Sequence, residues 1–223
     1  MQFLFSDDAG KTSLKLKGEE YKYLFKVRRH NVDDVLYFRT RDKSEALHSY
    51  RVTSLDGRSA TLEHVSTETK EIKSDKSLHI AWCVIDPKSV EKVLPSLNEI
   101  GVSKISFIYC ARSQKNFKTD IQRYERILET SSQQCGRSKQ IEFETFKTLD
   151  AFLDKNPDTV VLDFCDEVLG CDNEVSTVLI GCEGGFSEDE RTKVEKLQRF
   201  RLDTPMILRS ESAAMAIASK VLI

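Results

Sequence analysis

Two short segments near the end of the chain contain the residue types that suit a ligand site. Residues 181–185 read Gly-Cys-Glu-Gly-Gly, and residues 208–212 read Leu-Arg-Ser-Glu-Ser. The glycine segment follows the apolar run 175–180 and precedes a charged stretch that begins near Ser187. A glycine turn between a strand and a helix N-terminus commonly binds a ligand, because free backbone N–H groups point into the gap. The sequence therefore predicts a small-molecule site at this turn.

The charge inside the turn narrows the class of ligand. Glu183 occupies a place where a phosphate-binding loop has no carboxylate, and the segment lacks the Lys-Ser/Thr pair of a P-loop. An anionic turn suits a ligand that is cationic or rich in hydroxyl and amino donors. S-adenosylmethionine, with a sulfonium, an amino group and a ribose but no phosphate, has this chemistry. An alternative role for Glu183 is to accept hydrogen bonds from backbone N–H groups of its own turn.

The elements that must position these segments alternate between strands and helices from Leu78 onward. Apolar and β-branched runs predict strands at residues 78–85, 105–110, 159–164, 175–180 and 199–202. Helical spacing predicts helices over residues 90–100, with Gly101 as C-cap, and over residues 121–135, ending at Gly136. A third helix is expected from Ser187, where Glu190 completes a capping box. The last is expected over residues 210–222, with Ser210 as N-cap. This order predicts an α/β fold with a largely parallel sheet covered by helices.

The first third of the chain has a different pattern. Polar turns, including Asp56-Gly57, separate runs of β-branched and aromatic residues that predict strands at residues 35–38, 47–53 and 59–65. Strands at this spacing predict a small β-barrel or sandwich. A charged stretch follows at residues 66–76, and we place the domain boundary there. The expected domains are residues 1–70 and residues 71–223.

Composition excludes several classes of protein. The 223 residues are 39% apolar and 31% charged, as in a soluble globular protein, and no apolar run approaches the roughly 20 residues that span a bilayer. The six cysteines include no Cys-x-x-Cys pair and the four histidines show no ligand spacing. We therefore expect no metal, and reduced thiols in a cytoplasmic protein. The net charge of −2 gives no global attraction to nucleic acid, so RNA contacts must come from local patches.

The two segments, with their spacing, are similar to those of a known family. The block Gly-x-Glu-Gly-Gly-Phe-Ser from Gly181, followed by Ile-Leu-Arg-Ser-Glu-Ser-Ala from Ile207, resembles the RsmE family of ribosomal small-subunit RNA methyltransferases, which are SPOUT-class enzymes. The sequence departs from the family at Cys182, where proline is usual, at Asp203, where glycine is usual, and at Tyr23, where histidine is usual. Further similar motifs cover nearly the whole chain: Val27-Arg28-Arg29, Asn98-Glu99-Ile100-Gly101-Val102, Ala111-Arg112-Ser113 and Gln133-Gln134-Cys135-Gly136-Arg137.

The resemblance implies an N-terminal PUA-like β-barrel followed by a C-terminal α/β SPOUT domain with a trefoil knot. It implies S-adenosylmethionine as cofactor, and N3 of a uridine at the decoding site of 16S rRNA as the methylated atom. The expected partners are 16S rRNA or the small ribosomal subunit and a second copy of the chain in a homodimer, with no membrane. Two alternatives stay open. One is a SPOUT methyltransferase that acts on another RNA atom, such as a ribose 2′-hydroxyl. The other is a non-catalytic RNA-binding or ribosome-assembly module.

The resemblance implies the cofactor-binding residues, and the chemistry of methyl transfer and the positions of basic residues suggest the rest of the site. Arg209 is expected to stabilise the charge that develops on the uracil oxygens. Glu211 can accept the N3 proton or orient Arg209, and we favour orientation because an ordinary carboxylate is a weak base for this proton. The expected cofactor-binding residues are Leu162, Ile180, Gly181, Glu183, Gly184, Gly185, Leu202, Ile207 and Leu208. The basic residues expected to contact RNA are Lys26, Arg28, Arg29, Arg112, Lys115 and Arg137. For Lys115 and for the cluster of Lys26, Arg28 and Arg29, solvated surface charge is the alternative.

Overall fold

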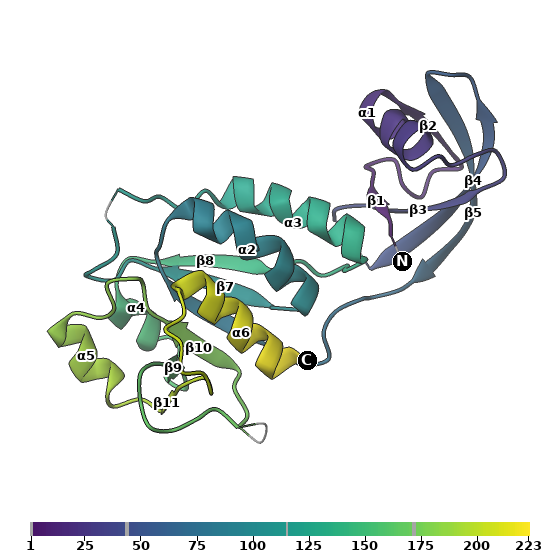
Figure 1. The fold of residues 1–223 in the computed structure, drawn as a ribbon. Helices are drawn as coiled ribbons and strands as arrows, with labels where there is room; N and C mark the ends of the chain where they lie inside the picture. The colour runs from purple at the N-terminus through teal and green to yellow at the C-terminus, as the bar shows by residue number, and fades with distance from the viewer. Residues whose placement is uncertain (1, 43–44, 115, 171–172) are drawn as a thin grey trace. The chain divides into compact units, whose positions relative to one another are not determined.

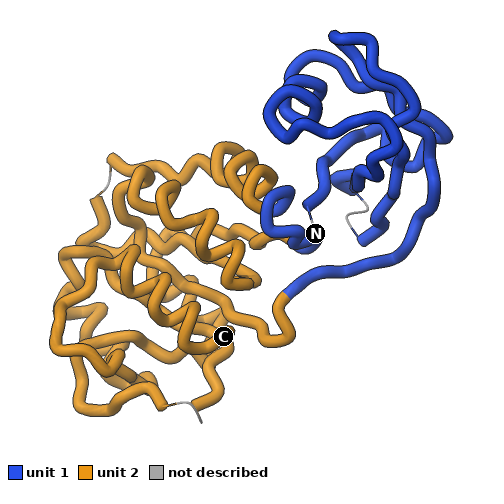
Figure 2. Tube along the Cα trace, turned by 45° about the vertical axis from the view of Figure 1, so that its right-hand side comes forward, with its two compact units in different colours: residues 1–73, 132–139 blue, residues 74–131, 140–223 orange. Residues whose placement is uncertain are grey.

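The computed structural model describes residues 2–42, 45–114, 116–170 and 173–223, and Figure 1 shows its fold. The chain divides into two compact units, coloured separately in Figure 2. The first unit comprises residues 1–73 and 132–139, and the second comprises residues 74–131 and 140–223. The sequence does not predict that residues 132–139 belong with the first unit. The domain limits at residues 70 and 71 stay a prediction.

Hydrogen bonds hold residues 132–139 within the first unit. The backbone carbonyl of Gln133 accepts from the N–H of Phe3 at 3.3 Å, and its side-chain Oε1 accepts from the N–H of Phe5 at 2.9 Å. The N–H of Ser138 donates to the carbonyl of Ile72 at 2.9 Å, and the N–H of Ile72 donates to Ser138 Oγ at 2.8 Å. Both ends of the 1–73 segment therefore bond to this short stretch.

The first unit is built on a five-stranded sheet with the order β1-β3-β4-β5-β2. β1 pairs parallel with β3, and the other neighbours are antiparallel. β3, β4 and β5 confirm the three strands predicted in this region, and Gly57 turns between β4 and β5 with a φ of 84°. Alternate residues of β2, Leu14 and Leu16, are buried, so one face of the sheet packs on the core. The strands span Leu4–Phe5 (β1), Ser13–Lys17 (β2), Val35–Arg39 (β3), Ala46–Leu55 (β4) and Ser59–Thr69 (β5).

A short helical segment connects β2 to β3. It comprises the α-helix α1 (Gly18–Tyr21) and a π-helical turn, η1 (Lys22–Val27). The buried side chains of this segment, Tyr21, Leu24 and Phe25, join the core of the sheet. The remaining side chains of η1 are exposed to solvent.

The second unit contains a six-stranded sheet in which every neighbouring pair is parallel, with the order β11-β9-β10-β6-β7-β8. This confirms the predicted parallel sheet and the five strands predicted in it. All residues of β6 are buried, as expected for a strand covered on both faces. β8 was not predicted. The strands span His79–Cys83 (β6), Lys104–Ile108 (β7), Glu142–Phe146 (β8), Val160–Leu162 (β9), Thr177–Ile180 (β10) and Arg199–Phe200 (β11).

Helices cover both faces of this sheet. Figure 1 shows α2 and α3 on one side of the strands and α4 and α5 on the other, and α6 packs against α2. Gly101 ends α2 with a φ of 114°, and Ser187 and Glu190 form the expected capping box at α5. Among the described residues, no helix combines the length and apolar character needed to span a bilayer. The helices span Pro87–Ile100 (α2), Ile121–Cys135 (α3), Leu149–Leu153 (α4), Glu188–Val194 (α5) and Ser210–Leu222 (α6).

The prediction that Ser210 caps the last helix is wrong. Arg209 is the N-cap residue of α6, it provides no side-chain cap, and Ser210 is the first helical residue. The hydroxyl of Ser210 points inward, where it accepts from Trp82 Nε1 at 2.8 Å and donates to the carbonyl of Gly181 at 2.7 Å. Trp82 is fully buried, so its N–H needs a partner inside the protein. This long-range requirement takes the hydroxyl away from the helix end.

Candidate active site

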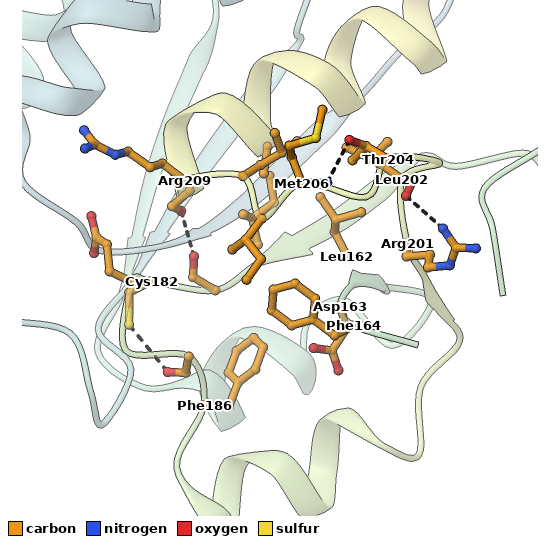
Figure 3. A pocket seen from close by; sticks show the side chains of 18 of the residues that line it. Leu162, Asp163, Phe164, Cys182, Phe186, Arg201, Leu202, Thr204, Met206 and Arg209 are labelled. Atoms are coloured by element: carbon orange, nitrogen blue, oxygen red, sulfur yellow. Dashed lines mark hydrogen bonds between the residues drawn. The ribbon is translucent and has the colours of Figure 1, made fainter. Parts of the chain in front are cut away.

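A cavity of about 480 Å³ opens in the second unit, where the segments after β9, β10 and β11 meet (Figure 3). Its walls are mainly apolar, from residues such as Leu162, Ile180, Phe186, Leu202 and Leu208. Ligands of open parallel sheets bind beyond the carboxyl ends of the strands, and this cavity has that position. Its volume lies within the range of small-molecule sites, about 300–1,000 Å³.

The two segments that the sequence singles out meet at this cavity. Gly181 and Glu183 line it from the glycine turn, and Arg209 lines it from the start of α6. The hydrogen bond from Ser210 Oγ to the carbonyl of Gly181 joins the segments directly. Because the same hydroxyl accepts from Trp82 on β6, one side chain fixes the turn, the helix and the sheet relative to one another.

Most of the residues expected to bind the cofactor line the cavity. Gly184 is absent from the described lining residues, and it lies instead against Arg112. Gly185 has a φ of 65°, which a residue with a Cβ rarely adopts, so glycine is needed for the backbone of the turn. The part of these residues in cofactor binding stays a prediction. Those that line the cavity are Leu162, Ile180, Gly181, Glu183, Gly185, Leu202, Ile207 and Leu208.

Cys182 closes the glycine turn from the inside. Its side chain is buried, and its Sγ donates to the carbonyl of Gly185 at 3.5 Å. The N–H of Gly185 donates back to the carbonyl of Cys182 at 2.9 Å. Burial raises the pKa of the Cys182 thiol, which therefore stays protonated near neutral pH. The residue that replaces the usual proline of the family thus holds the turn by its own hydrogen bonds.

Glu183 is exposed, and within the described chain its carboxylate accepts no hydrogen bond. The alternative in which Glu183 bonds the N–H groups of its own turn is therefore not formed in this structure. The carboxylate stays free to meet a cationic or donor-rich ligand.

Arg209 is the N-cap residue of α6, and Glu211 lies two residues further on, in its first turn. Arg209 is exposed, and in Figure 3 its side chain extends away from Arg201. Within the described chain, neither the Arg209 guanidinium nor the Glu211 carboxylate has a hydrogen-bonding or ion-pair partner. The predicted ion pair by which the Glu211 carboxylate would orient the Arg209 guanidinium is therefore not formed in this structure. The catalytic roles of both residues stay predictions.

The sequence reasoning missed a buried carboxylate at the edge of the cavity, which pairs with two partly exposed arginines. The side chain of Asp163 is 5% exposed, and its Oδ2 accepts from Arg191 Nη1 and lies 3.6 Å from Arg199 Nη1. The Arg191 guanidinium also lies 5.5 Å from the ring centre of Phe186. Asp163 directly follows β9, and a carboxylate at the end of a parallel strand is a signal that could have identified it.

The basic residues expected to contact RNA have different environments. Lys26, Arg28 and Arg29 are exposed in the first unit, and Arg28 donates through Nε and Nη2 to the hydroxyl of Tyr23 at 3.1 and 2.9 Å. Arg137 is buried at 6% exposure, its Nε donates to the carbonyl of Lys139, and burial lowers its pKa to about 10. Arg137 thus does not present its guanidinium to solvent in this structure.

Two further RNA predictions concern the second unit. Arg112 is exposed, and its Nη1 donates to the carbonyl of Gly184 at 2.9 Å. Lys115 lies outside the described residues. The RNA-binding roles stay predictions. Within the described ranges, no group of three or more histidine, cysteine or acidic side chains could hold a metal ion, and the cysteines there are free thiols.

Comparison with known proteins places the chain in a family. Residues 73–222 match the model of an RNA methyltransferase domain. The chain is 37% identical over 223 residues to the ribosomal RNA small subunit methyltransferase E of Helicobacter pylori, and the match covers 98% of each chain. The chain belongs to the ribosomal RNA small subunit methyltransferase E family. The RsmE resemblance of its two C-terminal motifs is thereby confirmed.

Solved structures of methyltransferases share the fold of this RsmE-family chain. A methyltransferase of Legionella pneumophila, solved with bound S-adenosylmethionine, is 20% identical with a TM-score of 0.76, covering 99% of this chain and 95% of that one. A ribosomal RNA small subunit methyltransferase E of Neisseria gonorrhoeae, also bound to S-adenosylmethionine, is 18% identical with a TM-score of 0.75, covering 98% of this chain and 95% of that one. At these identities the likeness concerns the fold.

Proposed function

We propose that this protein is an S-adenosylmethionine-dependent methyltransferase that acts on N3 of a uridine in 16S rRNA of the small ribosomal subunit. Its membership of the RsmE family supports the reaction and the substrate class. The observation that carries the proposal is that the glycine turn and Arg209 line the same cavity. In that arrangement, one wall can hold a methyl donor, and the Arg209 guanidinium, which pairs with no residue that the structure describes, lies beside it.

The residues of the cavity fit S-adenosylmethionine. Leu162, Leu202 and Leu208 offer apolar surface to an adenine ring. Within the described chain, the backbone N–H groups of Ile207 and Leu208 donate to no protein atom, so they are free to bind ring nitrogens. The exposed carboxylate of Glu183 suits a ligand that is positively charged. When bound, the cofactor supplies an electrophilic methyl group on its sulfonium.

The chain's own residues have to align the uridine and stabilise its charge. Methyl transfer is an in-line displacement, so positioning is the main contribution of the rigid turn. The target N3 lies on the pairing edge of the base, which must be unpaired or turned out. Its proton is weakly acidic, roughly two pKa units above neutral pH, so forming the anion costs about 3 kcal/mol. Arg209 can offset this cost by binding the uracil oxygen on which the charge develops.

The proposal extends to the fold type of each unit and to the oligomeric state. We propose that the five-stranded sheet of the first unit forms a PUA-like β-barrel, and that the cavity segments around Ile207 belong to the trefoil knot of a SPOUT domain. We further propose that the protein is a cytoplasmic homodimer. Light scattering at micromolar concentration tests the dimer, and a monomeric mass would contradict it.

The reaction is tested with purified small ribosomal subunits and with naked 16S rRNA, each taken from a strain that lacks the modification. The protein and S-adenosylmethionine are added, and the rRNA is digested and mapped by mass spectrometry. A methyl group on N3 of one uridine is the expected result. If neither substrate gains a methyl group, and calorimetry detects no cofactor binding to the free or RNA-loaded protein, the proposal is wrong.

Arg209→Ala tests the assigned chemistry. We expect turnover to be abolished, because the developing charge loses its partner, while cofactor affinity stays within a few-fold of wild type. Arg126→Ala, which removes an exposed arginine on α3, is the matched control and should leave turnover unchanged. Near-normal methylation by Arg209→Ala would reject the role of this residue.

A further inference from the structure

Glu190, on α5, links the start of its own helix to the loop that follows β7. Its side chain is largely buried, and its two carboxylate oxygens have different partners. Oε2 accepts from the N–H of Ser187 at 3.0 Å, within the capping box of α5. Oε1 accepts from the N–H of Ala111 at 2.8 Å, on the other loop. A capping box normally serves its own helix, so the second bond is an additional connection.

Arg112, the next residue of that loop, reaches the glycine turn itself. Its Nη1 donates to the carbonyl of Gly184 at 2.9 Å. A Cβ at Gly184 would lie 3.3 Å from the Cβ of Arg112, so the absence of a side chain permits this approach. Gly181, Glu183 and Gly185 of the same turn line the cavity, whereas Arg112 does not appear among the described lining residues. Arg112 therefore contacts the turn from outside the cavity.

The guanidinium of Arg112 can bind a second group while it holds the turn. The residue is exposed, and within the described chain its other N–H groups have no acceptor. A guanidinium presents five N–H donors in a fixed plane, so one can bind a carbonyl while others bind a phosphate in bidentate geometry. Lysine lacks this fork and binds as a single point charge.

We propose that Arg112 is a positioning residue that couples RNA binding to cofactor binding. The inference rests on the proposed function, because RNA supplies the phosphate. A phosphate bound to the outward N–H groups fixes the guanidinium, and the fixed guanidinium holds the Gly184 carbonyl and hence the turn that lines the cofactor cavity. Coupling between two binding sites is reciprocal, so each ligand raises the affinity for the other by the same factor.

The test measures this factor by calorimetry on the full chain. S-adenosylhomocysteine, which has no methyl group to transfer, is titrated with and without a saturating 16S rRNA fragment. For wild type we expect RNA to tighten binding by about 5-fold or more, within the usual range of coupling. For Arg112→Ala the ratio should fall to about one even when the RNA concentration is raised to saturate the variant. Arg112→Lys should bind RNA and still have a ratio near one, because an ammonium on a flexible stem lacks the rigid planar fork that fixes a phosphate relative to the Gly184 carbonyl.

Arg126→Ala provides the control. Arg126 is exposed on α3, and its Nε donates to the carbonyl of Gln122 in the same helix, so this variant should keep the wild-type ratio. A ratio of one in wild type, or an unchanged ratio in Arg112→Ala, overturns the inference. If the wild-type protein still methylates rRNA in that case, the proposed function stands alone. If it neither binds nor methylates rRNA, both proposals fail.

Discussion

Replacing Ser210 with alanine should destabilise the protein by about 1.5–4.5 kcal/mol. The hydroxyl is buried and bonds two groups at once, Trp82 Nε1 at 2.8 Å and the carbonyl of Gly181 at 2.7 Å. Trp82 is fully buried, so its N–H would lose its acceptor at a cost of about 1–3 kcal/mol. Gly181 as a residue is partly exposed, so the lost hydrogen bond to its carbonyl adds about 0.5–1.5 kcal/mol.

Urea unfolding followed by tryptophan emission measures this loss. Trp82 is the only tryptophan of the chain, so the signal comes from the indole that loses its partner. The matched control is Ser212→Ala, in the same first turn of α6 but exposed, which should stay within about 0.5 kcal/mol of wild type because alanine favours a helix. Affinity for S-adenosylhomocysteine should also fall in Ser210→Ala only. Equal free energies of unfolding for the two variants would refute the bridging role of the hydroxyl.

Two further predictions concern buried ionisable groups. His79 lies in β6 with its ring bonded to Ser106 Oγ at 2.8 Å, and burial lowers its pKa to about 4. In the unfolded chain the imidazole of His79 takes up a proton near pH 6.5, whereas in the folded protein it stays neutral until about pH 4. The free energy of unfolding should therefore fall by up to about 3 kcal/mol as the pH is lowered from 6.5 to 4. His79→Gln should flatten that slope in urea titrations at a series of pH values, and an equal slope would contradict the prediction. Asp163→Asn removes the carboxylate between Arg191 and Arg199 and should cost about 1–3 kcal/mol, with weaker binding of S-adenosylhomocysteine in calorimetry. Asp203→Asn, at an 81% exposed side chain, is its control and should cost at most about 0.5 kcal/mol, so equal losses would count against the Asp163 argument.

Local patterns were enough to predict most elements of the second unit. Apolar runs identified the buried strands, and the limits of α3 agree with its helical spacing because side chains three and four residues apart share a face. β8 was missed because Glu142 and Glu144 interrupt its apolar character. It lies at the edge of the sheet, where one strand neighbour and more solvent allow such residues.

The site was predictable only where its residues belong to recognisable motifs. Gly181 and Arg209 were expected to share a ligand site, and both line the cavity. The hydrogen bonds that support the two segments could not be inferred, because they join residues far apart in the sequence. Trp82 is 128 residues from Ser210, and Ala111 is 79 residues from Glu190. A serine before a helix has the same local appearance whether it caps the helix or bonds a buried indole.

The hydrogen bonds of residues 132–139 have a consequence for protein engineering. A truncated form that starts at residue 74 would retain Gln133 and Ser138 but lose their partners Phe3, Phe5 and Ile72. Exchanging only the N-terminal segment between relatives would likewise pair one parent's residues 1–73 with the other parent's 132–139. Chimaeras that keep each compact unit from a single parent therefore need crossovers after residues 73, 131 and 139.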